Sequence, residues 1–137
     1  LRTRVAQSPA AGHIDVLGFV PEAEMDALFA RVRVLAMPSR GEGFGLVYIE
    51  AMRRGIPVLA SVHDAGQEVV VNGETGYCVD LQHPDALAAA LLRLLREDQL
   101  LVQMADAARQ RWQSHFCFAR FEDRFSAVLD RFRMECS

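Results

Sequence analysis

The alternation of short apolar runs with amphipathic segments most constrains what this chain can fold into. Helical patterns over Glu22–Arg31 and Leu46–Arg54 separate runs that have the length and composition of buried strands. There are four such runs, each bounded by turn or helix signals: Ile14–Val20, Val34–Met37, Pro57–Ala60 and Tyr77–Val79. Strands that alternate with helices predict a parallel sheet, and therefore an α/β fold.

The region that follows the last strand contains helical patterns only. The predicted helices are Pro84–Arg96, Gln99–His115 and Phe118–Met134, which together form a helical C-terminal extension. The last helix carries an apolar stripe made of Phe118, Phe121, Phe125, Leu129 and Phe132. A stripe at helical spacing is typical of a buried face, so we expect most of it in the core.

Composition excludes several classes of function. The chain has 137 residues, and its 15 basic residues are all arginine, which excludes a phosphate-loop lysine and Schiff-base chemistry. With a net charge of −3, the chain lacks the basic character expected of a nucleic-acid-binding protein. The apolar runs are much shorter than the ~20 residues that span a bilayer, so only peripheral membrane contact is expected.

The cysteine and histidine residues predict no metal centre. Cys78, Cys117 and Cys136 are odd in number, far apart and not at ligand spacing from any histidine, which argues against a disulfide framework or a zinc site. This cysteine usage fits a reducing cytoplasm. The four histidines are expected at the surface or in loops, and Trp112 in a packing role. Arg53 and Arg54 are expected to complement a helix dipole.

A glycine-rich segment follows the second predicted strand. Pro38 ends that strand, and Gly41, Gly43 and Gly45 let the backbone approach a ligand closely before the next helix begins at Leu46. The carboxyl end of a parallel strand is where ligands bind in open α/β sheets, and the helix N-terminus favours an anion. Two carboxylates flank this helix start, because Glu42 lies in the loop and Glu50 on the second helical turn. Carboxylates and amides together match the diol, diphosphate and hydroxyls of a nucleotide sugar.

The segment Pro38–Met52, with Gly55–Val58 behind it, resembles the signature of retaining, two-domain glycosyltransferases of the glycogen synthase and mannosyltransferase type, which have the GT-B fold. Two glutamates separated by seven residues are its hallmark. The resemblance continues through Leu17–Val20, Glu68, Asn72–Gly76 and the helix that begins at Pro84. It implies a partial doubly wound, Rossmann-like parallel sheet, the C-terminal half of a GT-B fold.

The resemblance also implies roles for individual residues. Glu50 would bind the ribose hydroxyls of a nucleotide-diphosphate sugar, and Glu42 would contact the transferred sugar. Phe44, Gly45 and Leu46 would offer backbone amides to the sugar and phosphates, with Ser39 and Gly43 in the phosphate-proximal loop. No metal and no separate cofactor are implied, and the anomeric configuration of a transferred hexose would be retained by attack on the face from which the nucleotide leaves.

Some family features have no counterpart in this sequence. The arginine and lysine that grip the diphosphate, and the N-terminal acceptor-binding domain, would precede Leu1, so we expect residues 1–137 to be one truncated domain that is inactive alone. The family's glycine pair is poorly matched by Asp64-Ala65-Gly66-Gln67 before Glu68. Two central strands would also be missing. We therefore expect Val16–Val20 and Val34–Met37 to pair in a shifted register or with another copy.

Two further functions stay open beside the transferase fragment. One is a non-catalytic nucleotide- or nucleotide-sugar-binding module with an α/β fold. The other is an unrelated doubly wound nucleotide-binding domain, disfavoured because no Gly-x-Gly-x-x-Gly follows the first strand. The base, the sugar and the acceptor are not determined by these residues, and the acceptor class includes a glycan, a lipid or a small molecule. The intact protein is expected in the cytoplasm, with peripheral membrane contact an open alternative.

Overall fold

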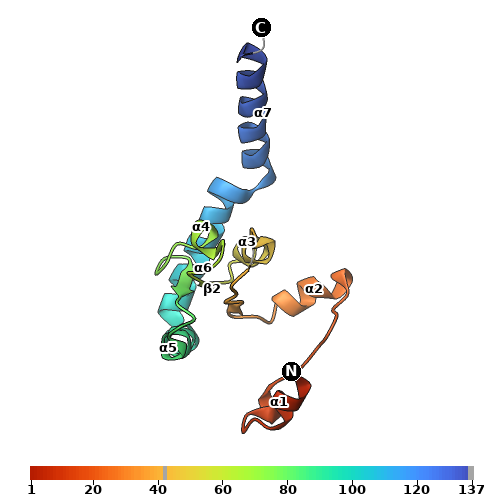
Figure 1. The fold of residues 1–137 in the computed structure, drawn as a ribbon, viewed down its shortest axis with the longest axis vertical. Coiled ribbons are helices and arrows are strands. Elements are labelled where there is room, and N and C mark those ends of the chain that lie inside the picture. The colour runs from red at the N-terminus through yellow and green to blue at the C-terminus, as the bar shows by residue number, and fades with distance from the viewer. Residues whose placement is uncertain (42, 136–137) are drawn as a thin grey trace. The chain divides into compact units, whose positions relative to one another are not determined.

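The computed structural model describes residues 1–41 and 43–135. The chain divides into two compact units, Leu1–Arg31 and Val32–Ser137, which are described separately below (Figure 1). The expectation of a single truncated domain stays a prediction.

The first unit contains short helices and no strand. Its elements are α1 (Arg2–Ala6), the 3-10 turn η1 (Ala11–His13) and α2 (Glu22–Phe29). The helix predicted over Glu22–Arg31 is confirmed, whereas the strand predicted over Ile14–Val20 is wrong, because that segment is irregular. Gly18 has φ +70°, a left-handed conformation that interrupts extended backbone. An apolar run becomes a strand only where a neighbouring strand completes its hydrogen bonds.

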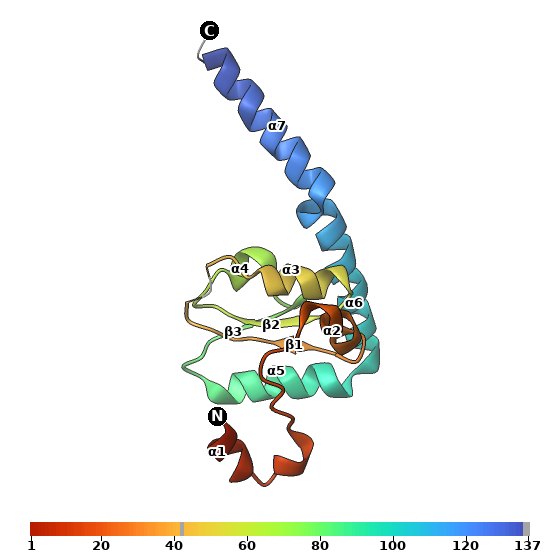
Figure 2. The same cartoon turned by 90° about the vertical axis from the view of Figure 1, so that its right-hand side faces the viewer.

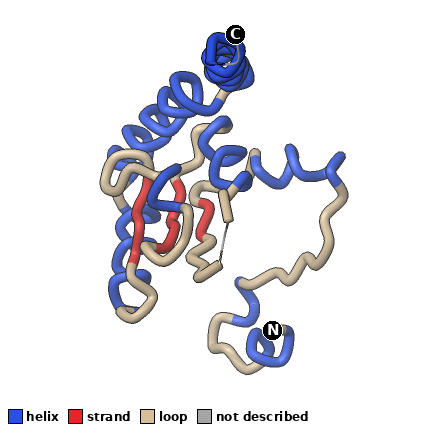
Figure 3. The backbone as a smooth tube through the Cα atoms, turned by 45° about the horizontal axis from the view of Figure 1, so that its top comes forward, coloured by secondary structure: helices blue, strands red, loops and turns tan. Residues whose placement is uncertain are grey.

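The second unit is built on a parallel sheet. The strands are β1 (Leu35–Ala36), β2 (Val58–Ser61) and β3 (Gly76–Val79), in the order β1-β2-β3 (Figure 3). Leu35 is paired with Val58, and Val58 with Gly76, so the three strands start level with one another. Three of the four predicted strands therefore form, and the α/β fold class is confirmed.

The shifted pairing expected for the first two runs is wrong. Residues 16–20 form no strand, and within the described part of the chain β1 pairs with β2 alone. Pairing of the β1 edge with another copy of the chain stays a prediction.

Helices cover both faces of the sheet. Figure 2 shows α3 (Leu46–Arg53) and α4 (Gly66–Val69) on one face, and α5 (Pro84–Arg96) on the other. The next helix, α6 (Asp98–Arg111), packs against both α3 and α5. All four β2 residues are buried, as is usual for a parallel strand with both faces covered. The largest fully buried side chains include Tyr48, Met52, Leu59, Leu94 and Met104.

The C-terminal segment differs from the prediction in two ways. The helix expected over Gln99–His115 ends at Arg111, and a π-helical turn, η2 (Trp112–Phe116), follows it. The last helix, α7 (Phe118–Glu135), forms as predicted and extends away from the sheet of its own unit (Figure 1).

The apolar stripe of α7 does not lie in the core. The exposed fraction is 75% for Phe118 and 65% for Phe132, so the expected burial is wrong. The physical reason is that α7 leaves the sheet after contacting η2, and its stripe therefore has no sheet face to pack on. No helix in the described residues has both the length and the apolarity to cross a membrane.

Candidate functional site

The loop between β1 and α3, residues 37–45, lies at the carboxyl end of the sheet. It contains the predicted site residues Ser39, Gly43, Phe44 and Gly45, and Leu46 is the first residue of α3. Glu42 lies outside the described residues. The structure therefore brings the described members of the predicted site to one edge, where ligands bind in open α/β sheets. We call residues 37–41 and 43–45, the described residues between β1 and α3, the β1–α3 loop.

Gly45 makes the sharp turn from this loop into α3. It is the N-cap residue of the helix, with φ +76° and ψ +50°, a conformation in which side chains other than glycine are strained. A Cβ atom here would also lie 2.4 Å from Cδ2 of Tyr48. The turn points the first amides of α3, including those of Leu46 and Val47, back along the helix axis toward the loop. An anion in the loop would be stabilised there.

Glu50 lies on the second turn of α3 and faces solvent. The opposite side of the helix is anchored in the core by Tyr48, Ala51 and Met52, so the fold directs Glu50 outward. Its backbone carbonyl accepts a hydrogen bond from Arg54 at 3.0 Å. The expected role of Arg54, which was to neutralise the helix C-terminus, agrees with this contact.

Asp64 is the most connected polar residue near the β1–α3 loop. Its Oδ2 accepts a hydrogen bond from Ser39 Oγ at 2.8 Å and lies 3.2 Å from the hydroxyl of Tyr48. Its Oδ1 accepts the N–H of Gly66 at 2.7 Å. The Tyr48 hydroxyl also donates to the carbonyl oxygen of Met37 at 2.8 Å. No role was predicted for Asp64 beyond its place in the segment that matches the family's glycine pair poorly.

A cavity of about 540 Å³ opens beside the first turn of α3. Phe44 and Leu46 line it together with Glu68 of α4, and residues of η2 and α7 complete its wall. Arg111 holds α4 in place by donating to the carbonyl oxygens of Val69 at 2.7 Å and of Glu68 at 2.9 Å. The contributions of η2 and α7 were missed, because no local pattern shows where a distant helix will pack. The contributing residues are His115, Phe116, Phe118, Phe121 and Arg124.

Two other polar contacts refine the sequence-based expectations. The guanidinium of Arg53 lies 5.7 Å from the centre of the Trp112 ring, so Arg53 links α3 to η2 by a cation–π contact. His63 Nε2 lies 2.8 Å from Oδ1 of Asp80, just beyond the ends of β2 and β3.

All four histidines are exposed, as expected. In the described parts of the chain, no group of three or more His, Cys, Asp or Glu side chains is arranged to hold a metal ion.

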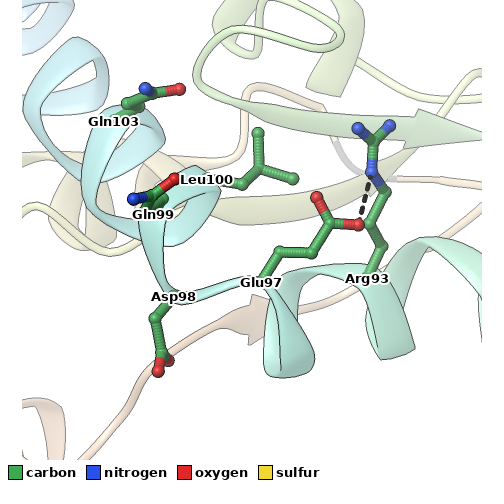
Figure 4. A pocket seen from close by; sticks show the side chains of 6 residues that line it. All are labelled: Arg93, Glu97, Asp98, Gln99, Leu100 and Gln103. Carbon is green, nitrogen blue, oxygen red and sulfur yellow. Dashed lines mark hydrogen bonds and ion pairs between the residues drawn. The ribbon is translucent and has the colours of Figure 1, made fainter.

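A second depression lies where α5 turns into α6. Figure 4 shows its lining, in which Arg93 and Glu97 form a 3.1 Å ion pair between exposed side chains. Because α5 runs back from the carboxyl end of β3, this junction lies at the amino end of the strands. It is therefore remote from the β1–α3 loop.

Comparison with known families shows which family the chain belongs to. The sequence model of the family described as "Glycosyl transferases group 1" matches residues 1–111. This chain belongs to the glycosyl transferases group 1 family. The matched range contains all three strands and the β1–α3 loop, while η2 and α7 lie beyond it.

Curated proteins share clear sequence similarity with the chain. It is 39% identical over 99 residues to a D-inositol 3-phosphate glycosyltransferase of Corynebacterium urealyticum, covering 69% of this chain and 23% of that protein. It is 37% identical over 102 residues to a phosphatidyl-myo-inositol mannosyltransferase of Mycolicibacterium smegmatis, covering 74% of this chain and 26% of that protein. The chain thus spans about a quarter of the length of these relatives.

A solved structure confirms the fold. Sucrose-phosphate synthase from Thermosynechococcus elongatus superposes with a TM-score of 0.85 at 27% identity, covering 97% of this chain and 33% of that one. The α/β fold is therefore that of the C-terminal portion of a GT-B glycosyltransferase, as the sequence predicted.

Proposed function

We propose that this chain is the donor-binding portion of a retaining glycosyltransferase that transfers a hexose from a nucleotide-diphosphate sugar. The observation that supports this most directly is the geometry of the β1–α3 loop. Gly45 turns the first amides of α3 toward the loop, and Glu50 faces solvent one turn further on. Membership of the group 1 family supports glycosyl transfer as the reaction that this arrangement serves.

In this proposal each predicted site residue binds one part of the donor. Glu50 accepts hydrogen bonds from the two ribose hydroxyls, and the amides of Phe44, Gly45 and Leu46 bind the sugar and the phosphates. Glu42 contacts the transferred hexose, and Ser39 and Gly43 lie near the diphosphate. Each hydrogen bond to a charged group contributes about 1.5 to 3 kcal/mol when water is excluded. Several together are needed, because a helix N-terminus adds only about 0.3 to 1 kcal/mol.

The reaction we propose breaks the bond between the anomeric carbon and the diphosphate oxygen. The acceptor hydroxyl oxygen forms the new bond on the same face of the sugar, so the configuration is retained, and its proton passes to the departing diphosphate. Fixed amide dipoles and cationic side chains stabilise the negative charge that develops on the diphosphate. No metal ion takes part. The acceptor, a glycan, a lipid or a small molecule, is bound by a domain outside residues 1–137, so this chain alone transfers no sugar.

Titration calorimetry with UDP, GDP and ADP tests the donor site. We expect one of these nucleotides to bind the chain, and Glu50→Ala to weaken that binding at least about tenfold, since a charge-assisted pair of hydrogen bonds is lost. Glu97→Ala is the matched control, because Glu97 is an exposed carboxylate at the amino end of the strands. Equal affinity in Glu50→Ala and the unsubstituted chain would remove Glu50 from the site.

The catalytic part of the proposal needs a separate assay. The chain is mixed with candidate nucleotide sugars and acceptors, and product is sought with and without a metal chelator. Nucleotide binding without transfer is the expected result. Sugar transfer by residues 1–137 alone would contradict the proposed need for a second domain. Transfer abolished by the chelator would contradict metal independence.

A further inference from the structure

The β1–α3 loop is held at both ends by one carboxylate. At its start, Ser39 Oγ donates to Asp64 Oδ2 at 2.8 Å. At its end, Gly45 lies against the ring of Tyr48, since a Cβ on Gly45 would be 2.4 Å from that ring, and the Tyr48 hydroxyl lies 3.2 Å from the same Oδ2. Asp64 itself belongs to a different segment, the connection between β2 and α4.

The Tyr48 side chain transmits this constraint to α3. It is fully buried, and its hydroxyl is shared between Asp64 and the carbonyl oxygen of Met37, the first residue of the loop. Gly66 also lies close to the ring, since an added Cβ there would be 3.3 Å from Tyr48 Cε2 and 2.5 Å from the Cβ of Ala60. Both glycines therefore leave room for the Tyr48 ring, which contacts the loop at Gly45.

Asp64 is fixed in turn from its own side. Its Oδ1 accepts the N–H of Gly66 at 2.7 Å, which orients the carboxylate so that Oδ2 faces the loop. Its side chain is half-buried, where hydrogen bonds to a charged acceptor are stronger than in bulk water. The carboxylate thus joins three segments: the β1–α3 loop, α3 and the start of α4.

The geometry points to Asp64 as a positioning residue that sets the conformation of the β1–α3 loop for donor binding. This inference rests on the proposed function, because the loop is the proposed site of the diphosphate and the sugar. Asp64 acts through Ser39 and Tyr48 and does not itself touch the donor. Because the contacts of Ser39 and Tyr48 with Asp64 are made without a donor, donor binding has less of the loop left to order.

Nucleotide affinity of the full chain, measured with UDP, GDP and ADP, gives the first test. We expect Asp64→Ala to weaken binding about tenfold, and Asp64→Asn to weaken it less, since asparagine keeps an acceptor for the Gly66 amide. Tyr48→Phe keeps the ring and removes the hydroxyl that contacts both Asp64 and the carbonyl oxygen of Met37. Combined with Asp64→Ala, it should weaken binding by less than the sum of the two single losses. Fully additive losses, or unchanged affinity in Asp64→Ala, would overturn the assignment.

Asp80→Ala is the matched control. Asp80 is a carboxylate in the connection after β3 that bonds His63 and the amide of Gln82, with no recorded contact to the β1–α3 loop among the described residues. Asp80→Ala should leave nucleotide affinity within about twofold of that of the unsubstituted chain, because the loss of these surface contacts changes little beyond stability. An Asp80→Ala loss equal to that of Asp64→Ala would show that any removed carboxylate has the same effect, and would overturn the assignment.

Amide hydrogen exchange in the ligand-free chain tests the positioning without any nucleotide. Asp64→Ala should raise the exchange rate of the first turn of α3, around Tyr48, while β2 keeps its protection. Unchanged exchange there overturns the assignment. If the unsubstituted chain binds no nucleotide but exchange rises as expected, the proposed function fails and the positioning by Asp64 stands.

Discussion

At the scale of single residues, the two neighbouring glycines Gly43 and Gly45 have different requirements. Gly45 has φ +76°, and a Cβ there would lie 2.4 Å from the Tyr48 ring, whereas a Cβ on Gly43 would meet none of the described atoms within 4 Å. Their alternate spacing in the sequence suggested one shared reason for glycine, which was close approach of the backbone to a ligand. Only the structure separates them, because the difference arises from a ring that folds back under the loop.

Gly45→Ala should therefore destabilise the chain by about 2 to 4 kcal/mol, since it combines backbone strain with a steric clash. Gly43→Ala should stay within about 0.5 kcal/mol, as expected for an open surface position. Urea denaturation of both variants measures the free energy of unfolding. A cost for Gly43→Ala equal to that for Gly45→Ala would contradict the assignment of strain to Gly45.

Asp80 gives a pH dependence with a defined sign. The N–H of Gln82, and next the side chain of His63, hold the pKa of Asp80 below its ordinary value. Because this pKa is lower in the folded than in the unfolded chain, the stabilisation is present above the unfolded pKa. It is lost as the pH falls through the folded pKa.

The stability difference between the unsubstituted chain and Asp80→Asn should accordingly shrink toward acid pH. The Asp80 side chain is 38% exposed, so the difference should be small at every pH and should decrease in high salt. Thermal unfolding followed over a pH series measures it. A difference that grows on acidification would have the wrong sign for a lowered pKa.

At the scale of elements, the local hydrophobic pattern was enough to predict a helix that packs on the elements next to it in the sequence. Pro84 and Asp85 begin α5 as predicted, and Gly55 follows the end of α3. The same pattern wrongly predicted a strand at residues 14–20, because strand formation also requires a partner strand. It also missed α4, whose four residues carry no helical period and are held by Asp64 at one end and Arg111 at the other.

The α7 stripe shows the same limit, and it gives a prediction about stability. Phe125 is 52% exposed, whereas Leu94 of α5 is fully buried. Leu94→Ala should cost about 2 to 5 kcal/mol, because it leaves a cavity in the core. Phe125→Gln should cost less than about 1 kcal/mol. Urea denaturation of both variants measures the loss in free energy of unfolding. A loss for Phe125→Gln larger than about 1 kcal/mol would show that the stripe is covered.

At the scale of the whole molecule, the edge of β1 that faces away from β2 bears on the predicted self-association of the chain. The amides of Leu35 and Met37 both donate to carbonyl oxygens on or next to β2, those of Pro57 and Leu59, at 3.0 Å. Along a strand successive amides alternate in direction, so the N–H of Ala36 points away from β2. An edge of this kind can pair with another chain.

Self-association through this edge predicts a specific effect of Ala36→Pro. Proline removes the outward N–H and leaves both amides that bond β2 intact, so the variant should fold and stay monomeric. Sedimentation velocity over a concentration series should show the unsubstituted chain forming dimers. A monomeric unsubstituted chain at high concentration, or equal association by Ala36→Pro, would exclude the β1 edge as the contact.

The sequence therefore predicted the fold class, which is confirmed, and a candidate site that stays a prediction, but not which contacts hold the loop of that site. Ser39, Gly45 and Glu50 were identified from one local motif. The support from Asp64 lies in a separate segment, and the cavity wall from η2 and α7 is more distant still. Contacts of this kind depend on tertiary packing, which no spacing of residues encodes.

Anchoring a loop at both ends has a consequence for the heat of ligand binding. The entropy of ordering the β1–α3 loop is lost when the chain folds, because Ser39 and Tyr48 already hold it to Asp64. A ligand that enters such a loop should bind with little unfavourable conformational entropy and a small heat-capacity change. Freeing either end would transfer that entropic cost from folding to binding, so a variant with a loosened loop would bind more weakly even with every ligand contact preserved.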